Sequence, residues 1–258
     1  MKMKQALFAA VPVMMMGLVA SGAKGQLRPC PDIDQVTGYK VLLDDVKLAK
    51  PDAADQRTLK DLWSRYLLTR LTEDDSEPGS VEWQLVACEA RSPRSTEFSS
   101  VIIRGLVDRD VVLEIWGAVD GESVFLNYAF LPLPAQSRVR QFWQREYKTK
   151  SVQGSEVARA LAKIDEIKAY ALIMRAVRSS ERDGVSAYDQ ASQDLGKSYS
   201  ILKKSFAAPE TEQKALLAYV QKKRCEIIET ARTSPQYKGL WKSTPEVQVK
   251  ALCPEVTP

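Results

Sequence analysis

Paired carboxylates offer the one catalytic chemistry that the residue types of this chain leave open. Hydrolysis of a glycan by this route needs two acids about 5–10 Å apart, one of them with a raised pKa. Glu82, Glu89 and Glu114 lie on segments patterned as strands, so they could converge on one sheet. Nothing in their spacing requires these side chains to lie close together. A carboxylate-based hydrolase is therefore kept as the second alternative to the non-enzymatic function expected below.

Most other catalytic chemistry is excluded by composition and motifs. The chain has no histidine, which removes Ser-His-Asp and Cys-His catalysis and His-ligated zinc. It also lacks the glycine-rich nucleotide loops and the nucleophile elbow. A Ser-x-x-Lys pair, Ser200 and Lys203, has none of its companion motifs and fits a helix surface. We therefore expect no catalytic residue, no metal ligand and no cofactor, and predict that the protein is not an enzyme.

A hairpin within residues 111–134 explains Glu114 without catalysis. Asp120-Gly121 is a strong two-residue turn signal between two apolar, strand-like runs. With this turn as the loop, Glu114 lies opposite Asn127 on the partly polar face, while Ile115 meets Leu126 on the buried face. The sequence thus predicts a structural role for Glu114.

A basic and aromatic segment follows the hairpin and supplies the candidate binding residues. They are Arg138, Arg140, Trp143, Arg145 and Lys148. Cations interleaved with aromatic rings suit anionic lipid headgroups or glycans, and nucleic acid is a less suitable partner for an exported protein. The other interpretation is an amphipathic connector helix, whose aromatic residues pack between the two halves of the chain.

The first 25 residues have the pattern of a secretory signal peptide. Lys2 and Lys4 precede an uncharged run, and small residues allow cleavage after Ala23 or Gly25. The apolar run is shorter than the roughly 20 residues that span a bilayer. We expect an exported protein, periplasmic or secreted.

Export favours disulfide bonds among the four cysteines. Their spacing favours Cys30 with Cys88 and Cys225 with Cys253. The rival pairing joins Cys30 to Cys253, and buried free thiols remain an alternative.

The two halves of the chain differ in charge and in secondary-structure pattern. Residues 26–135 carry 12 Lys+Arg against 19 Asp+Glu, and residues 136–258 carry 22 against 14. We predict an α+β fold, with a signal peptide at 1–25, an α+β domain at 26–135, a connector at 136–154 and an all-α helical-hairpin bundle at 155–258. The first domain has the order β-α-β-α-β-β, a small mixed sheet with two helices. The bundle is predicted from helical periodicity over Ser155–Arg182, Ser186–Phe206 and Thr211–Arg232.

The expected function follows from these exclusions. We expect a non-enzymatic scaffold or adaptor that acts through contacts with an unidentified protein partner in the cell envelope. The first alternative is a module that holds anionic lipid or glycan through residues 138–150. The opposite charges of the two halves also allow a homo-oligomer.

Overall fold

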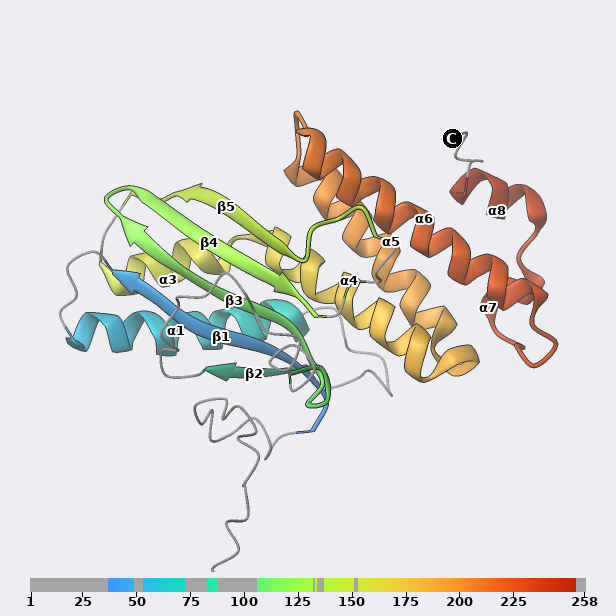
Figure 1. Cartoon of the computed structure of the whole chain (residues 1–258), viewed down its shortest axis with the longest axis horizontal. Helices are drawn as coiled ribbons and strands as arrows, with labels where there is room; N and C mark the ends of the chain where they lie inside the picture. Colours follow the sequence, from blue (N-terminus) through green and yellow to red (C-terminus); the bar gives the residue numbers. More distant parts are fainter. Residues whose placement is uncertain are drawn as a thin grey trace, which may run out of the picture.

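The computed structural model describes residues 37–48, 53–72, 83–87, 106–131, 133, 137–150 and 153–253. The predicted leader, Cys30, Cys88, Glu82 and Glu89 lie outside these residues, as does most of the second predicted helix. Strands and helices of the first part precede a helical region, as the α+β prediction expects (Figure 1). The first part contains β1 (Tyr39–Leu48), α1 (Ala53–Thr72), β2 (Trp83–Ala87), β3 (Val111–Asp120), β4 (Ser123–Phe130), β5 (Phe142–Lys148) and α3 (Gly154–Ala162). The helical region contains α4 (Asp165–Arg182), a short 3-10 helix (Gly184–Ala187), α5 (Tyr188–Ser205), α6 (Thr211–Thr233), α7 (Leu240–Ser243) and α8 (Glu246–Leu252).

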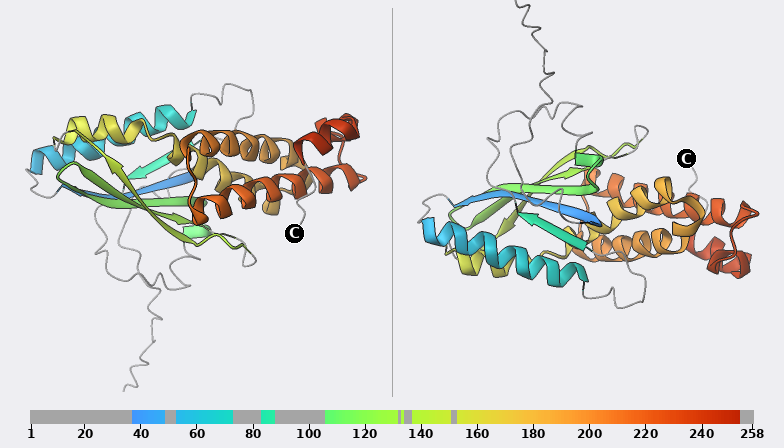
Figure 2. Two further views of the ribbon diagram at one scale, coloured as in Figure 1. Left: turned by 90° about the horizontal axis from the view of Figure 1, so that it is seen from above. Right: turned by 90° about the horizontal axis from the view of Figure 1, so that it is seen from below.

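The five strands form one mixed sheet in the order β2-β1-β3-β4-β5. β1 runs parallel to β2 and β3, while β3, β4 and β5 pair antiparallel. Helices α1 and α3 lie side by side over one face of the sheet (Figure 2). α4 packs against β3 and α5, and α5 packs against α6, so the helical layer continues away from the sheet. None of the described helices is both long and apolar enough to cross a bilayer.

The β3–β4 hairpin forms, but its register differs from the prediction by two residues. Asp120 pairs with Ser123, so the loop is Gly121-Glu122, and Gly121 has a φ of 55°. Glycine at the first loop position is typical of a type II′ turn, whereas the predicted Asp-Gly loop needs positive φ at both positions. Glu114 therefore lies opposite Ala129, and the predicted pairing with Asn127 is wrong. Because a shift of two keeps every side chain on its face, the predicted buried face is correct.

The predicted helix Ser155–Arg182 is divided in two at Lys163 and Ile164. Ile164 is extended, with φ −80° and ψ 92°, and precedes α4 as its N-cap. Asp165 and Glu166 follow in the first turn, where acidic side chains stabilise a helix. The break has a packing reason: α3 lies against α1 beside the sheet, while α4 lies against α5.

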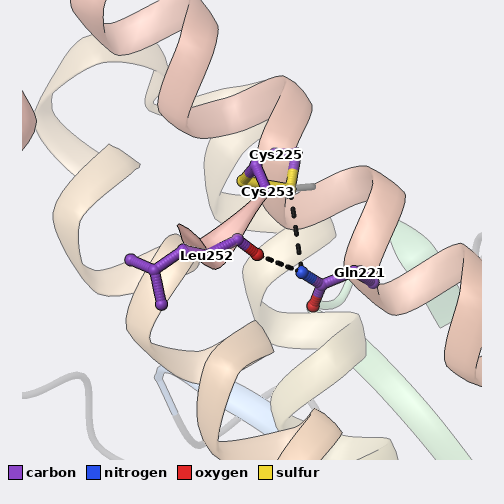
Figure 3. The surroundings of a disulfide bond; sticks show 4 residues. All are labelled: Gln221, Cys225, Leu252 and Cys253. Atoms are coloured by element: carbon purple, nitrogen blue, oxygen red, sulfur yellow. Dashed lines mark hydrogen bonds between the residues drawn. A yellow bond between two sulfur atoms is a disulfide. The ribbon is translucent and has the colours of Figure 1, made fainter. Parts of the chain in front are cut away.

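A disulfide fastens the C-terminal helices to the helical layer. Cys225 of α6 and Cys253 after α8 are bonded, with their Cα atoms 5.6 Å apart. Beside the bond, the Gln221 amide donates to the carbonyl oxygen of Leu252 (Figure 3). This confirms the predicted Cys225–Cys253 pairing and excludes the rival Cys30–Cys253 bond.

Removing this disulfide tests how much the bond between α6 and the end of α8 stabilises the fold. The variant Cys225→Ala/Cys253→Ala is expected to lower the free energy of unfolding by about 2–4 kcal/mol, because the unfolded chain regains the freedom of a loop spanning 28 positions. Urea titration of the variant and the oxidised wild type measures the difference. Gln221→Ala keeps the bond and serves as the control, with a loss of about 1 kcal/mol. A double variant as stable as the wild type would contradict the prediction.

Candidate functional site

The basic and aromatic segment is largely a strand and not a connector helix. Phe142–Lys148 form β5, which pairs with β4 at the edge of the sheet. Successive side chains of a strand point to opposite faces, so Trp143, Arg145 and Tyr147 share the face that meets the helices. Trp143 is buried and stacks on Phe206, with ring centroids 6.5 Å apart.

Arg145 belongs to a buried polar cluster centred on Glu166 of α4. Arg145 donates from Nε and Nη2 to the two carboxylate oxygens of Glu166, both at 3.1 Å. The hydroxyls of Tyr147 and Tyr170 donate to the same carboxylate at 3.1 and 2.9 Å. Tyr128 lies behind, with its hydroxyl oxygen 3.0 Å from that of Tyr147. These five residues, here called the Glu166 cluster, have their charges and hydroxyl groups satisfied inside the fold, so the cluster joins the sheet to the helices.

The other basic residues of the segment lie apart from Arg145. Arg138 is exposed. Arg140 is also exposed and pairs with Glu212 at 3.1 Å. Lys148 lies on the opposite face of β5 from Arg145, where its Nζ is 2.6 Å from Glu146 and 2.7 Å from the Ser123 hydroxyl. The structure therefore does not gather the five candidate residues into one basic surface.

A second buried charge pair lies deeper in the helical layer. Arg175 of α4 donates from Nε and Nη2 to the carboxylate of Asp194 on α5, at 2.7 and 2.8 Å. The Gln190 amide donates to the same carboxylate at 2.8 Å, and the Arg175 guanidinium lies 4.7 Å from the centre of the Trp83 ring. Like the Glu166 cluster, this pair has its partners within the fold.

A groove between α5 and α6 contains a cation that, unlike Arg145 and Arg175, has no partner among the described residues. The groove has a volume of about 670 Å³. Its lining, here called the Arg224 groove, consists of Gln193, Gly196, Lys197, Ser200, Ile201 and Arg224. Arg224 comes from α6 and the other five from α5. Among the described residues, none forms an ion pair or a hydrogen bond with Arg224, and its Nε is buried. Burial lowers the pKa of the Arg224 guanidinium.

The Ser-x-x-Lys pair borders this groove without forming a nucleophile. Ser200 donates its hydroxyl to the backbone oxygen of Gly196 at 3.0 Å. The Lys203 ammonium lies 6.0 Å from the centre of the Tyr199 ring. The Ser200 hydroxyl is thus hydrogen-bonded within its own helix and is not directed at a general base.

Sequence reasoning missed the Arg224 groove. Its two cations lie in lysine- and arginine-rich helices, where a solvated face is the ordinary interpretation. The one local signal is Gly196 in the middle of a helical pattern, because an internal glycine needs a packing or functional reason.

Comparisons with known proteins give no relative from which a site could be transferred. No family model, no curated protein and no solved structure matches the chain.

Proposed function

We propose that this chain is a non-enzymatic binding protein, a scaffold or adaptor of the cell envelope, which holds a protein partner on the α5–α6 surface. The observation that carries the proposal is Arg224, a partly buried cation that lies in an open groove and has no partner among the described residues. Buried charges are ordinarily paired. An unpaired one in a groove supports a binding surface whose counter-charge arrives with the partner.

The distribution of the remaining charges supports the same surface. Arg145 and Arg175, two basic residues at the sheet–helix junction, have carboxylate partners within the fold. The contacts of residues 138–150 in the structure therefore support lipid or glycan binding less well than the sequence pattern alone did. Glu114 faces Ala129 across the hairpin, which gives the carboxylate hydrolase no second acid at that position.

Position-specific crosslinking tests the proposal. A photoreactive amino acid at exposed Lys197 is expected to crosslink the exported full chain to a protein of the envelope fraction. The same group at exposed Arg57, on α1 at the sheet end of the molecule, serves as the control and is expected to give no such product (Figure 1). The product should persist at high salt, since contacts beyond a single charge hold a protein partner. Equal products at both positions, or lipid products alone, would contradict a protein partner at α5–α6.

A further inference from the structure

The Arg224 guanidinium is held in an unfavourable environment for a cation. Its Nε is buried without a hydrogen-bond acceptor, and no described carboxylate is close enough to pair with it. A desolvated donor and an unpaired charge both destabilise a folded protein. The folded chain alone thus gains nothing from a charged group at this position that an apolar side chain of similar size would not provide.

Gly196 is the structural reason why the guanidinium can occupy this place. A Cβ at Gly196 would lie 2.9 Å from Cζ and from Nη2 of Arg224, and 3.2 Å from Nε. The guanidinium therefore rests directly against the backbone of α5. Glycine in the middle of a helix is itself destabilising relative to alanine. An internal helix glycine and a desolvated guanidinium are therefore in contact at one place on the surface. Each destabilises the folded chain, and the position of the guanidinium depends on the glycine.

Such local conflicts are expected where a site is kept for binding. The groove offers two cations, Arg224 and Lys197, with the polar side chains of Gln193 and Ser200 between them and Ile201 at one end. From position 193 to 201 a helix rises about 12 Å, the length of a short peptide segment. A carboxylate matches the planar guanidinium through two parallel hydrogen bonds.

The lining favours an acidic protein segment over other anions. Among the described residues, the large hydrophobic side chains that are exposed are Leu68, Leu240 and Val247, and none of them lines the groove. Ile201 in the lining is only partly exposed, so the groove offers a lipid surface no exposed large hydrophobic side chain to insert. The groove also has no aromatic residue on which a nucleic-acid base could stack.

We propose that the Arg224 groove binds a carboxylate side chain of an acidic segment of the partner, with Arg224 as its anchor and Gly196 as the residue that positions the guanidinium. This inference rests on the proposed function and names the chemistry of its partner.

Binding of a fluorescein-labelled hexaglutamate peptide to the full chain tests the assignment. The wild type is expected to bind it saturably, and hexaglutamine is expected not to bind. Arg224→Met should weaken binding by about tenfold or more, the loss of a charge-assisted hydrogen-bonded pair. Lys204→Met removes the same charge from exposed Lys204, on α5 outside the groove, and should leave binding unchanged apart from a small electrostatic effect.

Gly196→Ala gives an independent test, because it leaves every charge in place. The new Cβ should displace the guanidinium and weaken hexaglutamate binding by a similar factor. Both Gly196→Ala and Arg224→Met are expected to unfold at the same temperature as the wild type or at a higher one. A large fall in the unfolding temperature of Arg224→Met would show that Arg224 is a structural residue, and would overturn the proposal.

Further experiments distinguish a carboxylate ligand from phosphate or lipid. They also separate the carboxylate inference from the proposed function. Arg224-dependent binding of inorganic phosphate or phosphatidylglycerol vesicles, without binding of hexaglutamate, would overturn the carboxylate assignment. If Arg224→Met still crosslinks to the protein partner from position 197, the carboxylate inference fails while the proposed function stands. If the wild type binds hexaglutamate but gives no protein crosslink, the proposed function fails, and the groove remains a carboxylate site.

Discussion

Replacing Asp194 by asparagine is expected to lower the free energy of unfolding by about 3–5 kcal/mol. The side chains of Arg175 and Asp194 are 2% and 0% exposed, so water cannot solvate the charge that remains. Asparagine has nearly the volume of aspartate, but its amide carries no charge and replaces one of the two acceptor oxygens by an NH2 donor. The loss arises chiefly from removing the carboxylate that binds Arg175 while the guanidinium keeps its charge in the interior.

Urea titration of three variants separates this effect from lost packing. The double variant Arg175→Met/Asp194→Leu removes both charges and should lie within about 1 kcal/mol of the wild type, because apolar residues of similar volume can replace a buried pair. Glu246→Gln removes one member of the exposed Glu246–Lys250 pair and should leave the unfolding midpoint where it is. If Asp194→Asn were as stable as the wild type, the charge of Asp194 would not be needed to stabilise buried Arg175, and the prediction would be contradicted.

Arg175 and Glu166 together explain why the sheet and the helical layer share one core. Arg175 lies between Trp83 of β2 and Asp194 of α5, and Glu166 binds Arg145 and Tyr147 of β5. Both residues belong to α4. The hydrophobic cluster around them runs from β1 to α6 without interruption.

Local patterns in the sequence predicted the elements better than their pairing. The alternating apolar residues of 111–130 gave both strands of the hairpin and their buried face. The register depends on which residue of Asp120-Gly121-Glu122 enters the loop, a choice between turn types of similar energy. A shift of two residues was enough to change the partner of Glu114 from Asn127 to Ala129.

The basic and aromatic segment shows a different limit. Its alternation of Trp143, Arg145 and Tyr147 with polar residues is a strand pattern, but its many cations suggested a surface helix. Only the pairing with β4 and the position of Glu166, 21 residues after Arg145, show that the cation points inward. Such long-range pairing leaves no local trace in the sequence.

The Arg224 groove is the clearest case of information that a sequence does not display. Gly196 and Arg224 belong to different helices, and their contact depends on how α5 and α6 pack. Helix periodicity shows which face of each helix is apolar, but not which polar residue of one lies over which residue of the other.

Alkaline pH is expected to unfold the protein steeply because of the Glu166 cluster. Burial is the largest cause that raises the pKa of Tyr128, Tyr147 and Tyr170 well above the usual value of about 10, and the charge of Glu166 raises each further. In the unfolded chain these tyrosines ionise near pH 10, whereas in the folded chain they stay protonated. Their stabilising contribution is therefore complete below pH 10 and is lost as the pH rises above it.

The expected slope follows from proton linkage. Each tyrosine lowers the free energy of unfolding by up to about 1.4 kcal/mol per pH unit, so the three together give about 4 kcal/mol per unit. A protein of ordinary stability then unfolds between about pH 11 and 13. Urea titrations at pH 9, 10 and 11 measure the slope, and the share of tyrosinate absorbance that comes from the three cluster tyrosines should appear together with the loss of helical circular dichroism.

Tyr128→Phe isolates the share of one tyrosine in this slope. Because Tyr147 donates to Glu166, the Tyr128 hydroxyl donates to the oxygen of Tyr147, and its removal at pH 7 loses one hydrogen bond, worth about 1 kcal/mol. Above pH 10 the variant should lose stability more slowly than the wild type, by about 1.4 kcal/mol per pH unit. The variant would then begin less stable at neutral pH and become the more stable protein near pH 11. A difference in tyrosinate absorbance between the wild type and Tyr128→Phe that rises at pH 10 while the helical signal persists would contradict this account, because Tyr128 would then ionise within the folded state.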